Sequence, residues 1–381
     1  SHPYCAVKWV RLKRNRIEII TQSPFLSSFF TIFAPIMQLE IINESEVAIL
    51  KETIRNAENI IIVGHKSPDG DALGACLAWA EYLRRQGKSP RIVVPDAFPD
   101  FLRWLPGIEQ VMRYDKHTDE VKALCLHADL IFCLDFNETN RLEELQEPID
   151  IAPAKRVMID HHLNPSIAGI LSVSHPEASS TCELVFRIIC QLSGFEQIDQ
   201  KIAAPIYCGM MTDTGGFTYN STRPEIYTII GMLLTTGIDK DKIYRNVYNN
   251  YSQWAIRLRG YLMSECLKVY DELHAAYFTV SRRDMKKFHF VRGDLEGLVN
   301  EPLRIKGQKL SVSLREDDRH DDLVLVSLRS VDDFPCNEMA AEFFNGGGHL
   351  NASGGKLHCS LDEAERVMQR ALLKYADLLK T

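Results

Sequence analysis

Residues 155–166 have the sequence KRVMIDHHLNPS, and the interpretation of the rest of the chain depends on this stretch. Residues 157–159 are apolar and predict a buried strand. Asp160, His161 and His162 follow the strand directly, with no spacer between them. A polar turn would explain this cluster if it stood alone. The cluster is better explained by a function if other predicted strands also end in acidic or histidine side chains.

From about residue 44 onward, strand patterns alternate with helical patterns. Short apolar runs predict the strands, and the longer segments between them have helical spacing. Strands that alternate with helices indicate βαβ units and a parallel sheet, so we predict an α/β fold with helices on both faces of that sheet. The predicted strands are 59–65, 90–95, 128–136 and 155–160, and the predicted helices include 71–87, 118–127 and 200–211. A further predicted helix runs through Ser193, and Ser179, Ser180 or Thr181 could cap its start.

The pattern changes after the stretch TDTGGFTY, and 381 residues are more than one hydrophobic core usually spans. Residues 223–270 look helical nearly throughout. Beyond them we predict a smaller α/β domain with a mixed sheet, in which 275–283, 309–316 and 322–330 are strands and 336–345 and 361–380 are helices. The predicted organisation is an extension at 1–38, a catalytic domain at 39–235, a helical linker at 236–270 and a substrate-binding domain at 271–381.

The first 38 residues allow two interpretations. Five basic residues between positions 8 and 16 precede a charge-free run at 19–39, which is similar to a signal peptide or a weak membrane anchor. Thr21 to Pro24 interrupt that run, and no clean cleavage site follows it. We therefore expect an extension outside the working fold and no stable membrane association. A true targeting segment is the alternative.

Composition narrows the class of protein. A net charge of −7 argues against a protein that coats long nucleic acid, because such binding neutralises many phosphates. A small phosphate-bearing substrate in a local positive site remains compatible with this charge. The ten cysteines never form a C-x-x-C pair, and most lie in apolar segments, which is typical of free thiols in a reducing compartment. We expect a cytoplasmic protein, and the sequence leaves a homodimer open.

Acidic and histidine side chains fall at the ends of several predicted strands. His65 ends the first strand, and Asp69 and Asp71 follow it; Asp135 ends another strand. Ligands of parallel α/β sheets bind at the carboxyl ends of the strands, so these side chains should meet Asp160 and His161 at one edge of the sheet. Asp213, after the helix predicted at 200–211, is a plausible fourth segment that brings a carboxylate to this edge. So many carboxylates would repel one another without cations between them. We predict two divalent ions, Mn²⁺ foremost and Mg²⁺ next, with Zn²⁺ and Co²⁺ as further alternatives.

Five motifs in order resemble those of one family. The stretches HKSPDGD (65–71), LDF (134–136), IDHH (159–162) and TDTGGF (212–217) resemble the motifs of the DHH phosphoesterase superfamily. FNGGGHLNASGG (344–355) resembles the glycine-rich motif of its DHHA1 domain. The similarity runs from about residue 44 to the end of the chain and is greatest to the bacterial nanoRNase and pAp phosphatase type. Each motif alone would be a weak signal, whereas five in order are specific.

The resemblance implies roles for individual residues. Asp160 would orient a histidine, and His162 would face the scissile phosphate as a charge stabiliser or acid. Arg329 would bind a substrate phosphate, with Asn351 a weaker candidate. The implied metal ligands are His65 and Asp69 for the first ion, Asp71, His161 and Asp213 for the second, and Asp135 as the bridge. The other implied substrate contacts are Ser327, Ser330, Gly346, Gly347, Gly348 and His349.

The expected function is metal-assisted hydrolysis of phosphate esters. The substrates implied by the resemblance are short oligoribonucleotides (nanoRNA and pApA), cleaved to mononucleotides, and 3′-phosphoadenosine 5′-phosphate (pAp), converted to AMP. A pyrophosphatase, a single-strand exonuclease and a membrane-bound cyclic-dinucleotide phosphodiesterase are less compatible with the motifs and the chain length. A non-catalytic nucleotide-binding regulatory module is the alternative from another class, although such a module would usually have lost a metal ligand and here all six are present.

Overall fold

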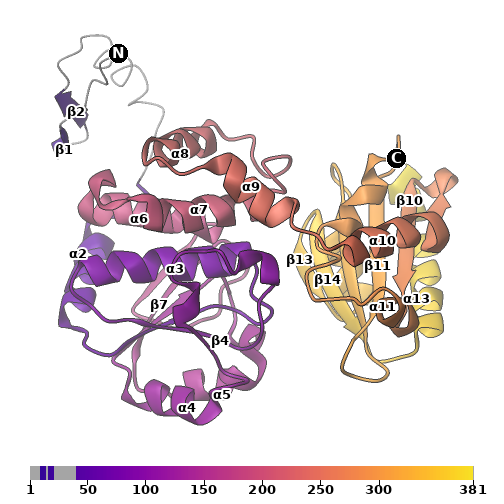
Figure 1. The fold of residues 1–381 in the computed structure, drawn as a ribbon, viewed down its shortest axis with the longest axis horizontal. Coiled ribbons are helices and arrows are strands. Elements are labelled where there is room, and N and C mark those ends of the chain that lie inside the picture. The colour runs from indigo at the N-terminus through magenta and orange to yellow at the C-terminus, as the bar shows by residue number, and fades with distance from the viewer. Residues whose placement is uncertain (1–8, 14–15, 21–39, 381) are drawn as a thin grey trace. The chain divides into compact units, whose positions relative to one another are not determined.

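The computed structural model describes residues 9–13, 16–20 and 40–380. The chain forms two compact units that divide between Val247 and Tyr248 (Figure 1). This division falls inside the linker predicted at 236–270. The finer boundaries at 38, 235 and 270 stay a prediction.

The first unit is built on a six-stranded sheet in which every pair of neighbours is parallel. The two central strands are buried along their whole length, as a sheet covered on both faces requires. This confirms the predicted parallel α/β architecture. In spatial order the strands are β5 (Val111–Arg113), β4 (Arg91–Val94), β3 (Ile60–Val63), β6 (Leu130–Leu134), β7 (Lys155–Asp160) and β8 (Leu171–Ser174).

Helices cover both faces of this sheet. On one face α3 (Gly70–Arg85) and α6 (Thr181–Ser193) contact the strands, and α7 (Gln200–Asp213) packs on those two helices. On the other face α4 (Thr118–His127) and α5 (Gln146–Asp150) enclose an apolar core (Figure 1). The remaining helices are α2 (Glu44–Asn56), α8 (Pro224–Thr235), α9 (Lys240–Tyr248) and the short 3-10 segments η1 (Asp100–Leu102), η2 (Ile108–Gln110), η3 (Thr139–Leu145) and η4 (Phe195–Gln197).

Two glycines allow α3 and α7 to lie very close together. A Cβ atom on Gly74 of α3 would lie 2.5 Å from the carbonyl oxygen of Pro205 in α7. A Cβ atom on Gly209 of α7 would lie 2.3 Å from Cys182 Sγ and 2.8 Å from Asp71 Oδ1. Any larger side chain would push the helices apart. This close approach brings the carboxyl end of α7, where Asp213 is located, beside the amino end of α3.

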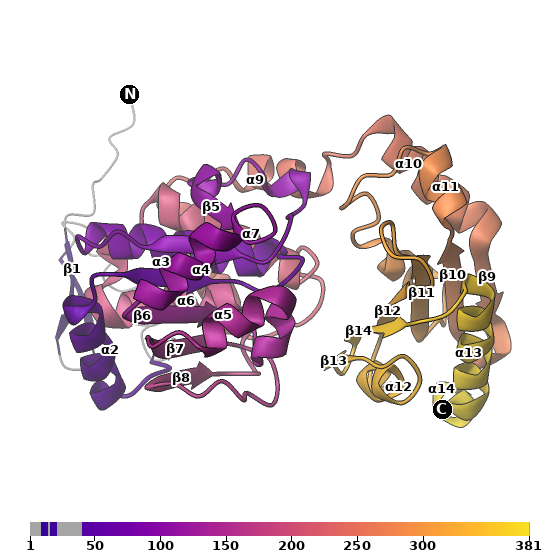
Figure 2. The same ribbon diagram turned by 90° about the horizontal axis from the view of Figure 1, so that it is seen from below.

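The second unit contains a mixed six-stranded sheet (Figure 2). Strands β10 and β11 are parallel, whereas all other neighbours are antiparallel. Helices α12 (Cys336–Phe343) and α13 (Leu361–Lys374) share an apolar core with one face of the sheet. Part of the other face packs with α10 (Gln253–Tyr261) and α11 (Arg282–Lys287). In spatial order the strands are β13 (Gly347–His349), β14 (Ala352–Leu357), β12 (Val324–Ser330), β11 (Leu310–Glu316), β10 (Ala275–Val280) and β9 (Leu267–Tyr270).

The helical prediction for 223–270 is wrong at its end. Residues Leu267–Tyr270 form strand β9, and the π-type turn Leu262–Cys266 separates it from α10. Because β9 is a short edge strand with two exposed central residues, it carries no apolar alternation that sequence reasoning could detect. The helix predicted at 361–380 is divided at Tyr375, after which α14 (Ala376–Lys380) begins. Two further 3-10 segments are η6 (Asp271–Leu273) and η7 (Leu298–Arg304).

The predicted extension at 1–38 lies mostly outside the described residues. Within it, β1 (Trp9–Lys13) pairs antiparallel with β2 (Arg16–Ile20). In the part of the chain that is described, no helix combines the length and the apolar character needed to cross a membrane.

Candidate metal centre

The predicted site lies where the strand order of the first sheet reverses. From β3 the chain proceeds to β4 and β5 on one side, then returns to β6 on the other side of β3. His65 comes shortly after β3, Asp135 comes directly after β6, and Asp160 is the last residue of β7. Ligands of open parallel sheets bind at such a reversal, outside the carboxyl ends of the strands. The topology thus places three of the sequence motifs at one edge.

The structure brings all six predicted metal ligands together. One potential ligand atom from each of His65, Asp69 and Asp135 lies within 4.8 Å of the other two, and Asp71, His161 and Asp213 form a second group that meets the same limit. Most of these side chains are buried, but those of Asp69 and Asp213 are 54% and 29% exposed. The cluster is therefore open to solvent at these two carboxylates.

Asp135 connects the two groups. Its Oδ2 lies 3.4 Å from His65 Nε2, and its Oδ1 lies 3.7 Å from His161 Nε2. The backbone of Asp135 has a φ of +66°, a left-handed conformation that few residues other than glycine adopt. Strained backbone of this kind tends to occur at functional sites. Each carboxylate oxygen of Asp135 thus faces a histidine of a different ligand group.

Each of the three histidines has one ring nitrogen fixed by an acceptor. His65 Nδ1 donates to the Lys66 carbonyl oxygen at 2.7 Å, and His161 Nδ1 donates to the Ala178 carbonyl oxygen at 3.3 Å. Because a carbonyl can only accept, the proton of each neutral ring is on Nδ1 and Nε2 is left with its lone pair. In both residues Nε2 is the atom that faces the carboxylates. This is the arrangement that metal-binding imidazoles usually have.

His162 is oriented by Asp160. The distance from His162 Nδ1 to Asp160 Oδ1 is 2.7 Å, and Asp160 is fully buried. The other oxygen of Asp160, Oδ2, has no hydrogen-bond partner among the described residues. The His162 side chain is 20% exposed, compared with 7% for His65 and 3% for His161. Its Nε2 is thus the imidazole nitrogen of this cluster most accessible to a substrate.

Asp69 combines a structural role with its place in the cluster. Its Oδ1 accepts hydrogen bonds from the backbone N–H groups of Asp71 and Ala72, at 3.0 and 3.1 Å, and so caps α3. Its Oδ2 lies 3.9 Å from His65 Nε2. Helix capping and metal binding are therefore compatible at this residue, because each uses a different oxygen.

The electrostatics of the cluster suit a bound cation. Burial raises the pKa of Asp71 well above its ordinary value, and the charges of Asp135 and Asp213 raise it further. Burial alone would lower the pKa of His161, but Asp213, Asp135 and Asp71 raise it to about 9. The carboxylates thus need positive charge nearby, and protonated imidazole supplies it. A divalent ion would supply that charge and leave the imidazoles neutral, so the residues present fit a metal centre.

Buried thiols nearby are poor competitors for such an ion. Burial, Asp135 and Asp71 raise the pKa of the Cys76 thiol, and burial and Asp71 do the same at Cys182. A protonated thiol is not a metal ligand. The donors are therefore imidazole nitrogen and carboxylate oxygen, a set that suits Mn²⁺ or Mg²⁺ better than a thiolate-binding ion.

Sequence reasoning missed two polar residues close to this centre. Asp96 Oδ1 accepts a hydrogen bond from the backbone N–H of Ser67 at 2.6 Å and so holds the loop after His65. Its position just after β4 follows the same strand-end pattern and could have identified it. Arg141, in η3, accepts a backbone hydrogen bond from Lys66 N at 3.0 Å, and its positive charge acts to lower the pKa of His65. Nothing in its local sequence signalled this proximity.

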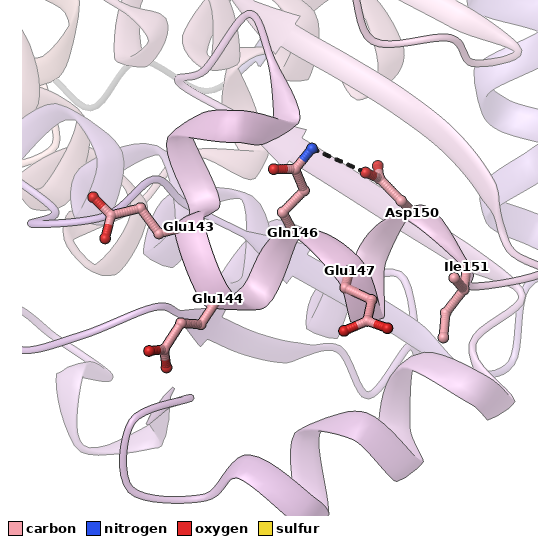
Figure 3. A pocket seen from close by; sticks show the side chains of 6 residues that line it. All are labelled: Glu143, Glu144, Gln146, Glu147, Asp150 and Ile151. Atoms are coloured by element: carbon pink, nitrogen blue, oxygen red, sulfur yellow. Dashed lines mark hydrogen bonds between the residues drawn. The ribbon is translucent and has the colours of Figure 1, made fainter.

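A separate hollow on the first unit contains none of the predicted site residues. Its volume is about 450 Å³, and its lining is mainly acidic, as Figure 3 shows. Within it Gln146 Nε2 donates to Asp150 Oδ2 at 3.2 Å. The predicted metal ligands lie elsewhere, at strand ends and at the adjoining ends of α3 and α7. The residues that line the hollow are Glu143, Glu144, Gln146, Glu147, Asp150 and Ile151.

The predicted substrate contacts of the second unit fall into two groups. Ser327 and Arg329 lie on the half-exposed face of β12, where Arg329 Nη1 donates to the Leu328 carbonyl oxygen and Nε has no partner among the described residues. Ser330 is on the buried face, and its hydroxyl donates to the Phe334 carbonyl oxygen at 2.8 Å. Asn351 Nδ2 donates to Ser330 Oγ at 2.9 Å. Ser330 and Asn351 thus fix the local backbone, whereas Ser327 and Arg329 are available to a ligand.

The glycine-rich motif forms an edge hairpin. Strand β13 pairs only with β14, and Leu350 and Asn351 connect the two. A Cβ atom on Gly346 would lie 1.8 Å from the Gly354 carbonyl oxygen, whereas one on Gly347 would meet nothing within 4 Å. An edge strand presents backbone N–H groups that no neighbouring strand uses. The first strand of this hairpin, which ends in His349, is therefore the edge of the sheet.

Comparison with known proteins agrees with this geometry. The model of the DHH family N-terminal domain matches residues 59–210, and that of the DHHA1 domain matches residues 275–377. The solved structure of an exopolyphosphatase-related protein from Bacteroides fragilis superposes on this chain with a TM-score of 0.85. The two sequences are 47% identical, and the match covers 90% of this chain and 99% of that chain. The chain belongs to the DHH family. It is a metal-dependent phosphoesterase, a hydrolase, and the resemblance inferred from its five motifs is confirmed.

Two further relatives were found. The bifunctional oligoribonuclease and PAP phosphatase NrnA of Bacillus subtilis (strain 168) is 27% identical over 84% of this chain and 95% of the relative. The structure of RecJ in complex with Mn²⁺ from Thermus thermophilus shares the fold, with a TM-score of 0.51 and 13% identity over 90% of this chain and 55% of that chain. The sequence similarity to this oligoribonuclease and PAP phosphatase thus covers nearly the whole length of the relative.

Proposed function

We propose that this chain binds two divalent ions, Mn²⁺ in preference to Mg²⁺, and hydrolyses short oligoribonucleotides to mononucleotides and pAp to AMP. The observation that carries the proposal is the meeting of six potential ligands in two groups joined by Asp135. The relative from Bacillus subtilis, which has both activities in its name, supports the choice of substrates.

The six side chains divide between the two ions. His65 and Asp69 would hold one ion, Asp71, His161 and Asp213 would hold the other, and Asp135 would give one oxygen to each. Divalent ions bound here would act as Lewis acids on the phosphoryl oxygens and favour hydroxide over water at neutral pH. Because the His65 and His161 rings are fixed through Nδ1, their Nε2 atoms need little rearrangement to bind.

His162 would act on the substrate rather than on an ion. Its Nδ1 makes a hydrogen bond with the buried Asp160 carboxylate, which fixes the orientation of the ring. The Nε2–H of that ring would donate to a phosphoryl oxygen or give its proton to the leaving oxygen. The greater exposure of His162 among the three imidazoles supports this assignment.

The second unit would bind a substrate phosphate. Arg329 offers a guanidinium on the half-exposed face of β12, with Ser327 two residues away on the same face. Gly347, Gly348 and His349 would add backbone and imidazole donors at the neighbouring edge. The N–H of Gly346 already donates to the Ala340 carbonyl oxygen, so this glycine would serve the close packing of the motif. These few donors suit a short substrate and not a long strand, in agreement with the net charge of −7.

A substrate panel tests the proposed activity. The full chain, stripped of metal and supplied with Mn²⁺, should convert a labelled dinucleotide to mononucleotides and pAp to AMP, and EDTA should stop both reactions. Inorganic polyphosphate belongs in the same panel, because one relative is described as exopolyphosphatase-related. Pyrophosphate and a 30-nucleotide single strand test the pyrophosphatase and exonuclease alternatives. Turnover of polyphosphate alone would contradict the proposal. No turnover of any substrate would favour the regulatory module.

Arg329→Ala should chiefly raise KM. The guanidinium would contribute binding in the ground state and the transition state alike, so its loss should raise KM for pAp about tenfold and leave kcat within about threefold. Arg366→Ala is the matched control, since Arg366 is an exposed arginine of the same unit that pairs with Glu363. Steady-state kinetics of both variants measure the effect. A drop in kcat without a change in KM would be incompatible with a binding role.

A cytoplasmic location is also a proposal. The nine cysteines that the structure describes are all free, and seven of them are buried. Free thiols in this number are typical of a reducing compartment.

A further inference from the structure

The first turn of α6 delivers three hydrogen-bond donors to two carboxylates of the candidate metal centre. Thr181 N donates to Asp71 Oδ2 at 2.6 Å, and Cys182 N donates to Asp71 Oδ1 at 2.9 Å. The Thr181 hydroxyl donates to Asp135 Oδ1 at 2.9 Å. Thr181 is fully buried, and Asp71 and Asp135 are nearly so. In the sequence Thr181 had only the appearance of a helix-capping residue, so its link to the centre is a finding of the structure.

The hydroxyl of Thr181 decides how the Asp135 carboxylate is turned. Asp135 Oδ2 faces His65 and Oδ1 faces His161, and these two imidazoles belong to different ligand groups. His65 holds Oδ2, and Thr181 is the hydrogen-bond donor to Oδ1. The imidazoles of His161 and His162 also face Oδ1, but their nitrogens lie 3.7 and 3.8 Å away, so the Thr181 hydroxyl makes the shorter contact with this oxygen.

A buried ionic network fixes the position of Thr181. Glu183, two residues on, accepts hydrogen bonds from both the backbone N–H and the hydroxyl of Ser179, at 2.8 and 2.7 Å. It also accepts from Arg187 and Arg223, each at 2.7 Å. Thr181 thus lies between two residues that bind each other, inside a completely buried turn. The network therefore holds the backbone from which the Thr181 hydroxyl projects.

We infer that Thr181 is a positioning residue that turns Asp135 so that one carboxylate serves two ions. The inference rests on the proposed two-ion centre. It also predicts that the two ions depend unequally on Thr181. Loss of the hydroxyl removes the hydrogen bond to Asp135 Oδ1 and leaves the contact between Oδ2 and His65 in place. The ion held by Asp71, His161 and Asp213 is therefore weakened more than the ion held by His65 and Asp69.

Calorimetric titration of the metal-stripped full chain with Mn²⁺ tests this. Thr181→Val keeps the shape of the side chain and removes the donor, whereas Thr181→Ser keeps the donor. Loss of an outer hydrogen-bond partner typically lowers metal affinity about 10–100-fold. In Thr181→Val we expect one of two Mn²⁺ sites to weaken by that factor and the other to change less than about threefold. Thr181→Ser should bind both ions like the parent.

Two controls separate positioning from a general loss of structure. Thr53→Val changes another buried threonine of the same unit, in α2, and should leave both affinities unchanged. Thermal unfolding of the metal-free proteins should show similar midpoints for the parent and Thr181→Val. In addition, excess Mn²⁺ should restore the kcat of Thr181→Val towards that of the parent, which it would not do for a misfolded variant.

The outcomes distinguish this inference from the proposed function. Two unchanged Mn²⁺ sites in Thr181→Val would overturn the inference and leave the metal centre intact. Equal weakening in Thr181→Ser and Thr181→Val would also overturn it, because the hydroxyl would then not be the cause. A parent chain that takes up no Mn²⁺ would overturn the proposed centre and the inference together.

Discussion

Asp135→Ala should abolish turnover and weaken the binding of both metal ions at once. Asp135 gives one oxygen to each ligand group, so its loss removes a ligand from both ions. The expected fall in kcat is about 10³-fold or more, beyond the roughly 10–100-fold that loss of an outer partner costs. Turnover of pAp and Mn²⁺ titration of the same preparation measure the two effects together.

Asp150→Ala is the matched control for this variant. Asp150 lines the acidic hollow of Figure 3 in the same unit and binds Gln146, outside both ligand groups. This variant should retain the turnover and Mn²⁺ binding of the parent. Circular dichroism should show that both variants are folded. Near-normal activity in Asp135→Ala would refute its assignment as the bridge.

Glu183→Ala should destabilise the first unit strongly. Glu183 is fully buried and pairs with the buried Arg187 and with Arg223. Removing one partner of a buried ion pair leaves an uncompensated charge, which typically costs about 3–5 kcal/mol. Urea denaturation should show a free energy of unfolding lower by about this amount. Arg223→Ala removes the more exposed arginine, and its cost should be nearer 1 kcal/mol.

The stabilisation that Glu183 gives to the folded state should decrease as the pH falls. Burial alone would raise the pKa of Glu183, but Arg187 and the hydrogen bonds from Ser179 hold it below its ordinary value of 4.5. A depressed pKa means that the stabilisation is fully present above pH 4.5 and is lost as the pH falls through the folded-state pKa. The difference between the parent and Glu183→Ala should therefore be largest near neutral pH and shrink in acid. A difference that grew in acid would contradict the assigned ion pairs.

The sequence predicted the parts of the fold whose physical signal is local. Buried parallel strands such as β6 consist of continuous apolar residues, and β12 alternates clearly between buried and half-exposed positions. Edge strands such as β9 have too little burial to leave a pattern. The separation of α13 from α14 at Tyr375 had no breaker residue to announce it.

The candidate site could be predicted because parallel strands deliver their ends to one edge. His65, Asp135 and Asp160 required only the strand assignments and the rule for that edge. Asp96, just after β4, follows the same strand-end rule, whereas Thr181 and Arg141 could not be identified in this way. The proximity of these two residues to the centre depends on how α6 and η3 pack, and this information resides in contacts between residues far apart in the sequence.

Anomalous diffraction from crystals grown with Mn²⁺ tests the central claim most directly. The account predicts two manganese peaks, one beside His65 and Asp69 and one beside Asp71, His161 and Asp213, with Asp135 in contact with both. A single peak, or peaks away from these side chains, would contradict it.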